Sequence, residues 1–393
     1  MAHEPQATVP SIKITRRAVA RLIGGHPWVY RSDIHDADVP AGIVRVVDQR
    51  GRVQGRALWS PTSEIRLRLL TTEDCDITRG WWQARIGAAR DRRMPLESIT
   101  NAYRIVHAEA DGLPALIIDR YADHAVVQLL SAGLEAVRGD VLGAIVDVLS
   151  PESILLRNDA SVRRHEGLSL TVEEAYGSVP PHVEIREATR RFGVDLRSGQ
   201  KTGGFLDQRD NRLHMAKLAV GHALDLFTYQ GWFAIHLAER ADAVRAVDTS
   251  EPALEQARHN AQRNACTNIE WIAANAFDEL RILERAGARF DTIVLDPPAF
   301  AKRRDNLERA LAGYKELNLR AMRLLTPGGH LLTCSCSYHV TRSQFLEMLR
   351  AAAADCGRRI ELERHMGQSA DHPEVLTIPE TGYLKGALLR AAH

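Results

Sequence analysis

The pattern of hydrophobic and polar positions changes along the chain at about residue 200. Beyond this point, short apolar runs alternate with longer amphipathic stretches, a pattern that predicts strands separated by helices. One helix is expected in SEPALEQARHNAQRNA, where Ser250 suits the N-cap and Pro252 the first turn. Alternating strands and helices predict a parallel sheet covered by helices on both faces, with strands at 223–227, 244–247, 269–272, 292–295 and 330–334.

Residues 10–75 have the pattern of a small β domain. Two β-rich runs flank Arg50 and Gly51, which predicts a hairpin. The following segment EIRLRLL alternates apolar residues with Arg66 and Arg68, and it predicts a half-buried strand with a basic outer face.

The middle of the chain mixes helix and strand patterns. A helix is expected to begin after Thr78 and to end at Pro95, and another to end before Pro151. Strands are expected on both sides of a polar turn at 119–124, and further strands up to about residue 195. We therefore predict an α/β protein with three domains: a small β domain at 1–76, an α+β domain at 77–190 and a doubly covered parallel sheet at 191–393.

Composition excludes several classes of protein. The 393 residues are 45% hydrophobic and 26% charged, without the bias of a fibrous or disordered chain. No apolar run approaches the roughly 18 residues that a membrane helix needs, and the N-terminus lacks the apolar core of a signal peptide. We therefore expect a cytoplasmic protein without a membrane partner. The five cysteines are odd in number and irregularly spaced, which favours free thiols, and no second pair completes a metal site.

Net charge is +1, but residues 1–110 hold 17 Lys and Arg against 12 Asp and Glu. A basic N-terminal part is compatible with RNA binding. A randomly uneven surface explains the charge nearly as well.

A nucleoside site is expected where the strand that contains Asp225 runs into a loop with Gly231. About 20 residues later a second strand ends in Asp248, a position suited to binding ribose hydroxyls. The loop lacks the Gly-x-Gly-x-x-Gly that brings the backbone against a pyrophosphate, so a ligand without phosphates such as S-adenosyl-L-methionine fits. A glycine turn in any α/β sheet would explain the same loop. The predicted cofactor contacts in these segments are Asp225, Phe227, Thr228, Gly231, Asp248 and Thr249.

The ends of the next three strands carry further chemistry. Asn275, Ala276 and Phe277 follow the third strand, where the adenine would lie, although Phe277 suits the core equally well. Asp296 follows the fourth strand and is stiffened by two prolines. It is suited to contact the cofactor and to hold a base edge, with helix capping as the structural alternative.

Cys336 lies at the end of the fifth strand, on the same edge as Asp296. Carbon-5 of a pyrimidine is too weakly nucleophilic to attack a sulfonium methyl unless a thiolate first adds to carbon-6. Cys336 is therefore the candidate nucleophile, and Asp296 would stabilise the charge on the ring. Cys334 would face the same side one layer deeper, as apolar filler.

An ordered set of motifs resembles one family. The segments GGHPWVYRSDI, EADGLPALIIDRY, GQKTGGFLDQRDNR, DLFTYQGWF, VDTS, LDPPAF, SCSYH and YLKG follow the order found in bacterial PUA-domain 23S rRNA cytosine-5 methyltransferases of the RlmI type. The resemblance implies a class I methyltransferase fold, an N-terminal PUA domain, S-adenosyl-L-methionine as donor and 23S rRNA or its large-subunit precursor as substrate. Within SCS, the cysteine that matches the family nucleophile is Cys336.

The remaining candidates are polar residues for RNA and the cofactor. Lys201 and Arg209 suit RNA phosphates or the cofactor carboxylate, although Gln208 and Arg209 suit a structural cluster equally well. We predict Gln208 and Arg209 as cofactor contacts and Arg16, Arg17, Arg31 and Lys201 as RNA contacts, with a solvated face as the alternative for the arginines. A homodimer is compatible with the sequence.

Two other functions compete with formation of 5-methylcytosine. A methyltransferase that acts on an exocyclic amine of guanine or adenine would use the Asp-Pro-Pro motif and would need no thiol. A non-catalytic RNA-binding assembly factor would bind S-adenosyl-L-methionine without turnover.

Overall fold

The computed structural model describes residues 9–34, 37–300 and 306–392. Within these residues the chain forms two compact units. Unit 1 contains the chain up to Ile185 together with 194–204 and 371–381, and unit 2 contains 186–193, 205–370 and the chain from Gly382 onward. The three-domain boundaries at 76/77 and 190/191 stay a prediction.

Unit 1 begins with a five-stranded sheet of order β1-β3-β4-β5-β2. The predicted hairpin is confirmed, because β3 and β4 pair antiparallel. The sequence pattern missed α1, an eight-residue helix in which only Ala18 and Leu22 are buried. The elements are β1 (Ser11–Lys13), α1 (Arg16–Ile23), β2 (Trp28–Tyr30), β3 (Gly42–Val47), β4 (Val53–Trp59) and β5 (Ile65–Thr71).

The predicted basic outer face of β5 is wrong, because Arg66 and Arg68 are buried. Arg68 Nη2 lies 2.8 Å from Glu166 Oε1, a carboxylate that is itself buried. The Arg66 guanidinium lies over the Trp59 ring, 5.7 Å from its centroid. Strand alternation places side chains on two faces, but burial of each face depends on what packs against it.

A second sheet of unit 1 has the order β10-β9-β8-β7-β6 and packs against two helices. The helix expected after Thr78 is confirmed, since the Thr78 side chain caps α2 by accepting from Trp81 N. The elements are α2 (Arg79–Arg93), β6 (Ala102–His107), β7 (Leu116–Tyr121), β8 (His124–Leu129), α3 (Ala132–Glu135), α4 (Arg138–Leu149), β9 (Ser153–Asn158) and β10 (Thr171–Tyr176). A separate two-stranded sheet joins β11 (Val183–Glu187) and β12 (Arg190–Val194).

Unit 2 is built on a seven-stranded sheet of order β15-β14-β13-β16-β17-β19-β18. The five predicted strands are present and pair parallel to one another. The sequence pattern missed β19 and β18, which add antiparallel at one edge. The strands are β13 (His222–Leu226), β14 (Ala243–Asp248), β15 (Ile269–Ala273), β16 (Phe290–Leu295), β17 (Leu325–Ser335), β18 (Ile360–Met366) and β19 (Lys385–Ala391).

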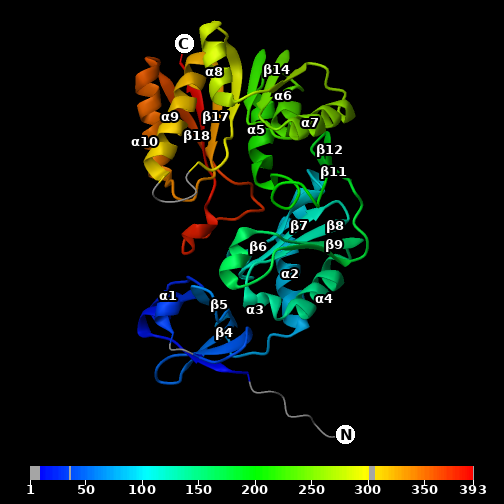
Figure 1. The fold of residues 1–393 in the computed structure, drawn as a ribbon, viewed down its shortest axis with the longest axis vertical. Helices are drawn as coiled ribbons and strands as arrows, with labels where there is room; N and C mark the ends of the chain where they lie inside the picture. Colours follow the sequence, from blue (N-terminus) through cyan, green and yellow to red (C-terminus); the bar gives the residue numbers. More distant parts are fainter. Residues whose placement is uncertain (1–8, 35–36, 301–305, 393) are drawn as a thin grey trace. The chain divides into compact units, whose positions relative to one another are not determined.

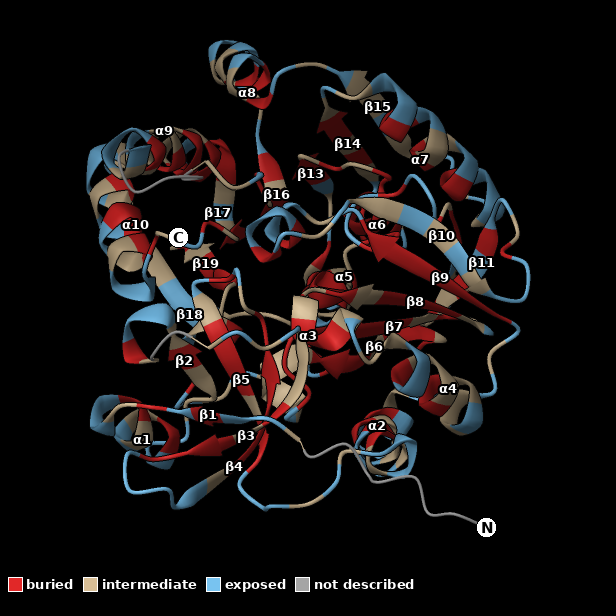
Figure 2. Ribbon diagram, turned by 60° about the horizontal axis from the view of Figure 1, so that its bottom comes forward, coloured by how far each residue is buried: buried red, intermediate tan, exposed pale blue. Residues whose placement is uncertain are grey.

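Helices cover both faces of this sheet, as predicted (Figure 1). One face packs against α8 (Ala276–Arg285), α9 (Leu307–Leu324) and α10 (Arg342–Cys356). The other packs against α5 (Arg209–Leu218) and α6 (Trp232–Leu237), with α7 (Glu251–Arg263) on the same side. Figure 2 shows the central strands buried along their length, whereas the helices are exposed on their outer sides.

Strand register aligns the carboxyl ends of the four central strands. Leu226 of β13 pairs with Val247 of β14 and with Leu295 of β16. Leu295 in turn pairs with Thr333 of β17. The residues that follow these positions therefore gather at one edge of the sheet, where ligands of open α/β sheets bind.

A buried ion pair joins β11 to the helices beside this edge. Arg212 of α5 donates two hydrogen bonds of 2.6 Å to Glu187, and His236 of α6 lies 3.0 Å from the same carboxylate. Burial alone would raise the pKa of Glu187, but Arg212 and His236 hold that pKa well below its usual range. Loss of one partner would leave an uncompensated buried charge.

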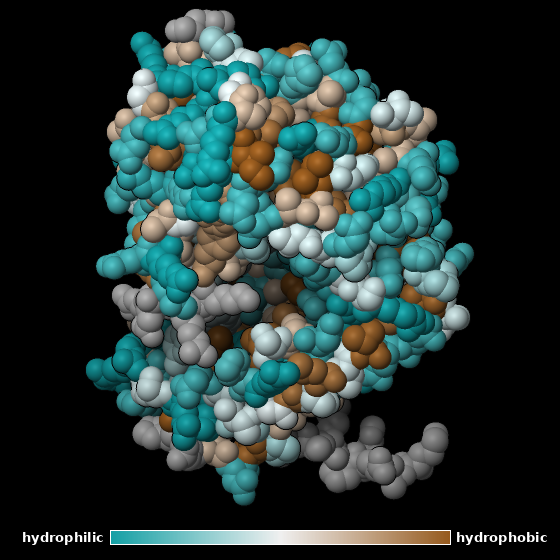
Figure 3. Space-filling view, turned by 45° about the horizontal axis from the view of Figure 1, so that its top comes forward, coloured by the Kyte–Doolittle hydropathy of each residue, from teal (hydrophilic) through white to brown (hydrophobic). Residues whose placement is uncertain are grey.

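The surface view in Figure 3 is mostly hydrophilic, with separate apolar patches. Among the described residues, every helix is too short or too polar to cross a bilayer.

A substitution at Gly231, just before α6, tests how tightly the loop after β13 is packed. Its φ is +79°, and a Cβ there would lie 2.6 Å from the Trp271 ring and 2.9 Å from Ala257 Cβ. We expect Gly231→Ala to destabilise unit 2 by about 2–5 kcal/mol, because left-handed strain adds to overpacking. Urea unfolding monitored by tryptophan fluorescence measures this loss.

Gly287 provides the matched control. Its φ is +68°, and a Cβ there would meet no atom within 4 Å. Gly287→Ala should therefore carry only the strain, about 1–2 kcal/mol. Equal losses in the two variants would contradict the packing argument.

Candidate active site

The loop that follows β13 has an unusual backbone. Phe227 and Tyr229 have φ values of +65° and +50°, although neither is glycine. Non-glycine residues in this region mark strained segments that are common at functional sites. The buried Asp225 carboxylate holds the loop by accepting from Thr228 Oγ1 at 2.5 Å and from Ala234 N at 3.0 Å.

Asp248 ends β14 beside this loop. One carboxylate oxygen accepts from Tyr229 N and the other from Ser250 N, both at 2.9 Å. The side chain remains partly exposed, and the adjoining Thr249 is exposed. A carboxylate has about four acceptor positions, so Asp248 retains capacity to accept from ribose hydroxyls.

The third predicted cofactor segment begins α8. Asn275 caps this helix by accepting from Phe277 N at 2.9 Å. Ala276 is buried, whereas Phe277 is half-buried and its ring lies 6.1 Å from that of Phe300. An apolar ring, a carboxylate with free acceptor positions and a strained loop at neighbouring strand ends fit S-adenosyl-L-methionine.

Three carboxylates at this edge influence one another. The pKa of Asp225 is raised to about 7, mainly by burial and also by the negative charges of Asp296 and Asp248. Asp296 follows the last residue of β16 directly and is partly exposed. The structure therefore brings together the predicted cofactor carboxylates and the predicted base-binding carboxylate.

Cys334 of β17 and Cys336, which directly follows this strand, differ in burial as expected. Cys334 is fully buried, and its pKa is raised well above the ordinary value by burial and by the charge of Asp296. Cys336 is only partly buried and packs against the same hydrophobic cluster as Cys334, so both face one side of the sheet. Cys334 is therefore an inert thiol, and Cys336 is the accessible one.

Residues of α9 and β19 hold the Cys336 segment in place. Tyr314 of α9 lies with its hydroxyl 2.9 Å from Ser337 Oγ. Lys385 Nζ donates to Ser337 O at 2.7 Å and to Tyr383 O at 2.8 Å. The YLKG motif contains Lys385 and was the only sequence signal for it.

Gln208 and Arg209 are almost completely buried. Gln208 Oε1 accepts from Asn211 Nδ2 at 2.5 Å, and its side chain also forms a hydrogen bond with Cys334. Arg209 Nε lies 3.1 Å from Asp210 Oδ1. These contacts agree with the structural alternative, and binding of the cofactor stays a prediction.

The predicted RNA contacts belong to unit 1 and are exposed. Arg17 binds Asp33 at 2.8 Å and Ser32 at 3.0 Å. Arg31 lies 4.0 Å from Glu64. Arg16 and Lys201 are exposed as well.

Trp232, which follows Gly231, packs the start of α6 against neighbouring elements. Its buried ring stacks on Phe192, with centroids 4.8 Å apart, and the Arg212 guanidinium lies 4.9 Å from its centroid. The start of α6 is thus fixed against β12 and α5.

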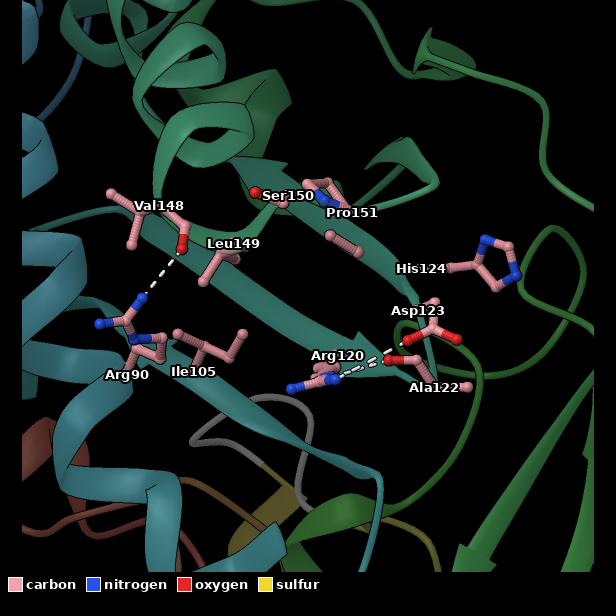
Figure 4. Close-up of a pocket in the computed structure, with 11 residues that line it drawn as sticks. Arg90, Ile105, Arg120, Ala122, Asp123, His124, Val148, Leu149, Ser150 and Pro151 are labelled. Carbon is pink, nitrogen blue, oxygen red and sulfur yellow. Dashed lines mark hydrogen bonds and ion pairs between the residues drawn. The ribbon is translucent and has the colours of Figure 1, made fainter.

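A separate cavity of about 140 Å³ lies in unit 1 (Figure 4). Its two arginines are already engaged: Arg90 donates to Val148 O, and Arg120 donates to Ala122 O and binds Glu97. None of the predicted catalytic or cofactor residues lines it. Among the described residues, no group of three or more His, Cys, Asp or Glu is arranged to hold a metal ion.

Comparisons with known proteins agree with this geometry. Residues 12–72 match the PUA-like domain family, and residues 171–384 match the S-adenosylmethionine-dependent methyltransferase family. A protein described as an S-adenosylmethionine-dependent methyltransferase from Streptococcus mutans has the same fold, with a TM-score of 0.81 and 19% identity over 97% of this chain and all of that chain. A related structure, a methyltransferase complexed with SAH, has a TM-score of 0.84 with the same identity and coverage.

Two curated relatives match nearly the whole chain. The ribosomal RNA large subunit methyltransferase I of Tolumonas auensis is 41% identical over 94% of this chain and 96% of its own length. The protein of the same name from Salmonella typhi is 36% identical over 97% of each chain. The chain therefore belongs to the ribosomal RNA large subunit methyltransferase I family and is an S-adenosylmethionine-dependent methyltransferase.

Proposed function

We propose that this enzyme forms 5-methylcytosine in 23S rRNA or its large-subunit precursor through a covalent bond between Cys336 and the base. The names of the relatives support a large-subunit rRNA substrate. The contrast between the two thiols supports the chemistry: Cys334 is sealed in the core, whereas Cys336 is accessible beside Asp296.

Each residue has a defined part in this mechanism. S-adenosyl-L-methionine, when bound, supplies the methyl group. The Cys336 thiolate bonds to carbon-6 of cytosine, which makes carbon-5 nucleophilic enough to take the methyl group. Loss of the carbon-5 proton then expels the thiolate and restores the aromatic ring. Asp296, protonated or sharing a proton with ring nitrogen-3, stabilises the charge that develops on the base.

The base must leave its helical stack to reach Cys336. In this proposal Arg16, Arg17, Arg31 and Lys201 contact the RNA phosphates. The cofactor would be held by Asp248 at the ribose, by the 275–277 segment at the adenine, and by the 225–231 loop, with Thr249, Gln208 and Arg209 nearby. Cytoplasmic location and a homodimer remain predictions.

Cys336→Ser tests the covalent mechanism. We expect methylation of 23S rRNA to fall by at least about 10³-fold, because an alcohol is a far weaker nucleophile toward carbon-6. Mass-spectrometric mapping of nucleotides methylated with labelled donor measures product and position. Wild-type protein should also form a covalent complex with RNA containing 5-fluorocytosine, from which no carbon-5 proton can be lost.

Cys334→Ala is the control, and it should retain most activity because that thiol is buried and inert. Full activity of Cys336→Ser, with the methyl group on an exocyclic amine, would support the amine methyltransferase instead. Binding of the donor without product on any rRNA would support a non-catalytic assembly factor.

Asp248→Asn tests the cofactor assignment. We expect the Kd for S-adenosyl-L-methionine to rise by about 10–100-fold, since a hydrogen bond to a charged group contributes about 1.5–3 kcal/mol. Isothermal titration calorimetry measures the change. Asp242→Asn alters an exposed carboxylate just before the amino end of the same strand and should bind like wild type. An unchanged Kd in Asp248→Asn would contradict the ribose assignment.

Asp225→Asn tests the buried carboxylate. Because the pKa of Asp225 is raised to about 7, the folded protein keeps a proton that the unfolded chain releases, so stability falls as pH rises from about 4 to 7. Asparagine does not titrate, so the Tm of the variant relative to wild type should rise over this window. Each unit of pKa shift corresponds to about 1.4 kcal/mol. A constant Tm difference between pH 4.5 and 7.5 would contradict this account.

A further inference from the structure

Lys385 is a buried cation next to the end of β17, the strand that Cys336 directly follows. It begins β19 and pairs in register with Ser335, the residue before Cys336. Its side chain is only 5% exposed. The two hydrogen bonds to Ser337 O and Tyr383 O fix the ammonium beside the backbone that follows Cys336.

The surroundings of this ammonium are unusual for a buried charge. A buried lysine normally pairs with a carboxylate, since an unpaired ion in the interior is costly. In the part of the chain that the structure describes, no carboxylate lies within ion-pair distance of Lys385, and its hydrogen bonds go to carbonyl oxygens. The pKa of Lys385 is lowered to about 8: burial is the main cause, the Cys336 sulfur opposes it, and the charge of Arg342 adds to it.

Charges around the sulfur come from several elements. The negative charge of Asp296, which follows β16, helps to raise the pKa of the neighbouring Cys334. The same charge disfavours any second anion nearby. Burial raises the pKa of Tyr314 in α9, and the negative charge of the Cys336 sulfur acts in the same direction. Lys385 and Arg342 at the start of α10 are the cations linked to this cluster. A thiolate beside Asp296 thus requires a compensating positive charge.

We propose that Lys385 is a positioning residue that stabilises Cys336 as its thiolate, an inference that rests on the proposed role of Cys336 as nucleophile. The ammonium is held by hydrogen bonds to two carbonyl oxygens, one of them from the residue directly after Cys336, so its positive charge acts on the nearby sulfur through space. Cys336 gives its proton to solvent and Lys385 keeps its own, so the lysine forms no bond with the base. The same two hydrogen bonds hold the Cys336 segment in place.

The rate of Cys336 alkylation as a function of pH tests this role in the full-length protein. Iodoacetamide reacts with the thiolate, and mass spectrometry of the peptide that contains Cys336 measures the rate between pH 5 and 10. The assay needs neither RNA nor methyl donor. It therefore reports on Lys385 even if Cys336→Ser shows that the proposed function is wrong.

Lys385→Gln removes the charge but keeps a hydrogen-bond donor, and Lys385→Arg keeps both. We expect Lys385→Gln to raise the apparent thiol pKa by about one unit and to lower alkylation at pH 7 about tenfold, whereas Lys385→Arg should stay near wild type. Lys315→Gln, which changes a lysine of α9 that binds Asp355, is the control for loss of charge elsewhere. The proposal would be overturned if the pH profile of Cys336 alkylation were unchanged in Lys385→Gln. It would also be overturned if Lys385→Arg raised the apparent thiol pKa as much as Lys385→Gln does.

The wild-type protein supplies a measurement that does not depend on the folding of any variant. The apparent pKa of Cys336 should lie below the ordinary value of about 8.5 for a free cysteine. A wild-type value at or above that figure would mean that no cation stabilises the thiolate, and the role of Lys385 would be excluded.

Discussion

The alignment of parallel strand ends in unit 2 is the constraint on which the rest of the site depends. Leu226, Val247, Leu295 and Thr333 lie side by side in four neighbouring strands. The residues that follow them come from segments more than 100 positions apart in the chain, yet they meet at one edge. A shift of one residue in β16 or β17 would turn Asp296 or Cys336 to the opposite face.

Buried charges make this edge both stable and reactive. Arg212, Glu187 and His236 form a group of short hydrogen bonds, which fixes α5 and α6 beside the loop after β13. Among the described residues no cation contacts Asp225, and burial raises its pKa although hydrogen bonds from the loop oppose this. Lys385 is the reverse case, a buried cation held by carbonyl oxygens. Shifted pKa values of this kind are concentrated where a site needs a particular protonation state.

Much of the fold could be predicted because its signals are local. The capping residues Thr78 and Ser250 mark helix starts through hydrogen bonds within one turn. The apolar runs of the parallel strands are continuous because both faces are covered. By contrast, α1 is only eight residues long and lies among short strands, and β18 is mostly exposed on a sheet edge.

The sequence by itself determined the alternation of strands and helices and the family motifs, because these are local patterns. The prediction that Cys334 is buried followed from its position within an apolar strand. Only the tertiary structure decided that Arg66 and Arg68 are buried, since the partner carboxylate Glu166 lies about 100 residues away. The same holds for Lys385, which reaches the Cys336 segment through the antiparallel pairing of β19 with β17. Local patterns set the elements, whereas long-range pairing sets the dielectric surroundings and charge partners of each side chain.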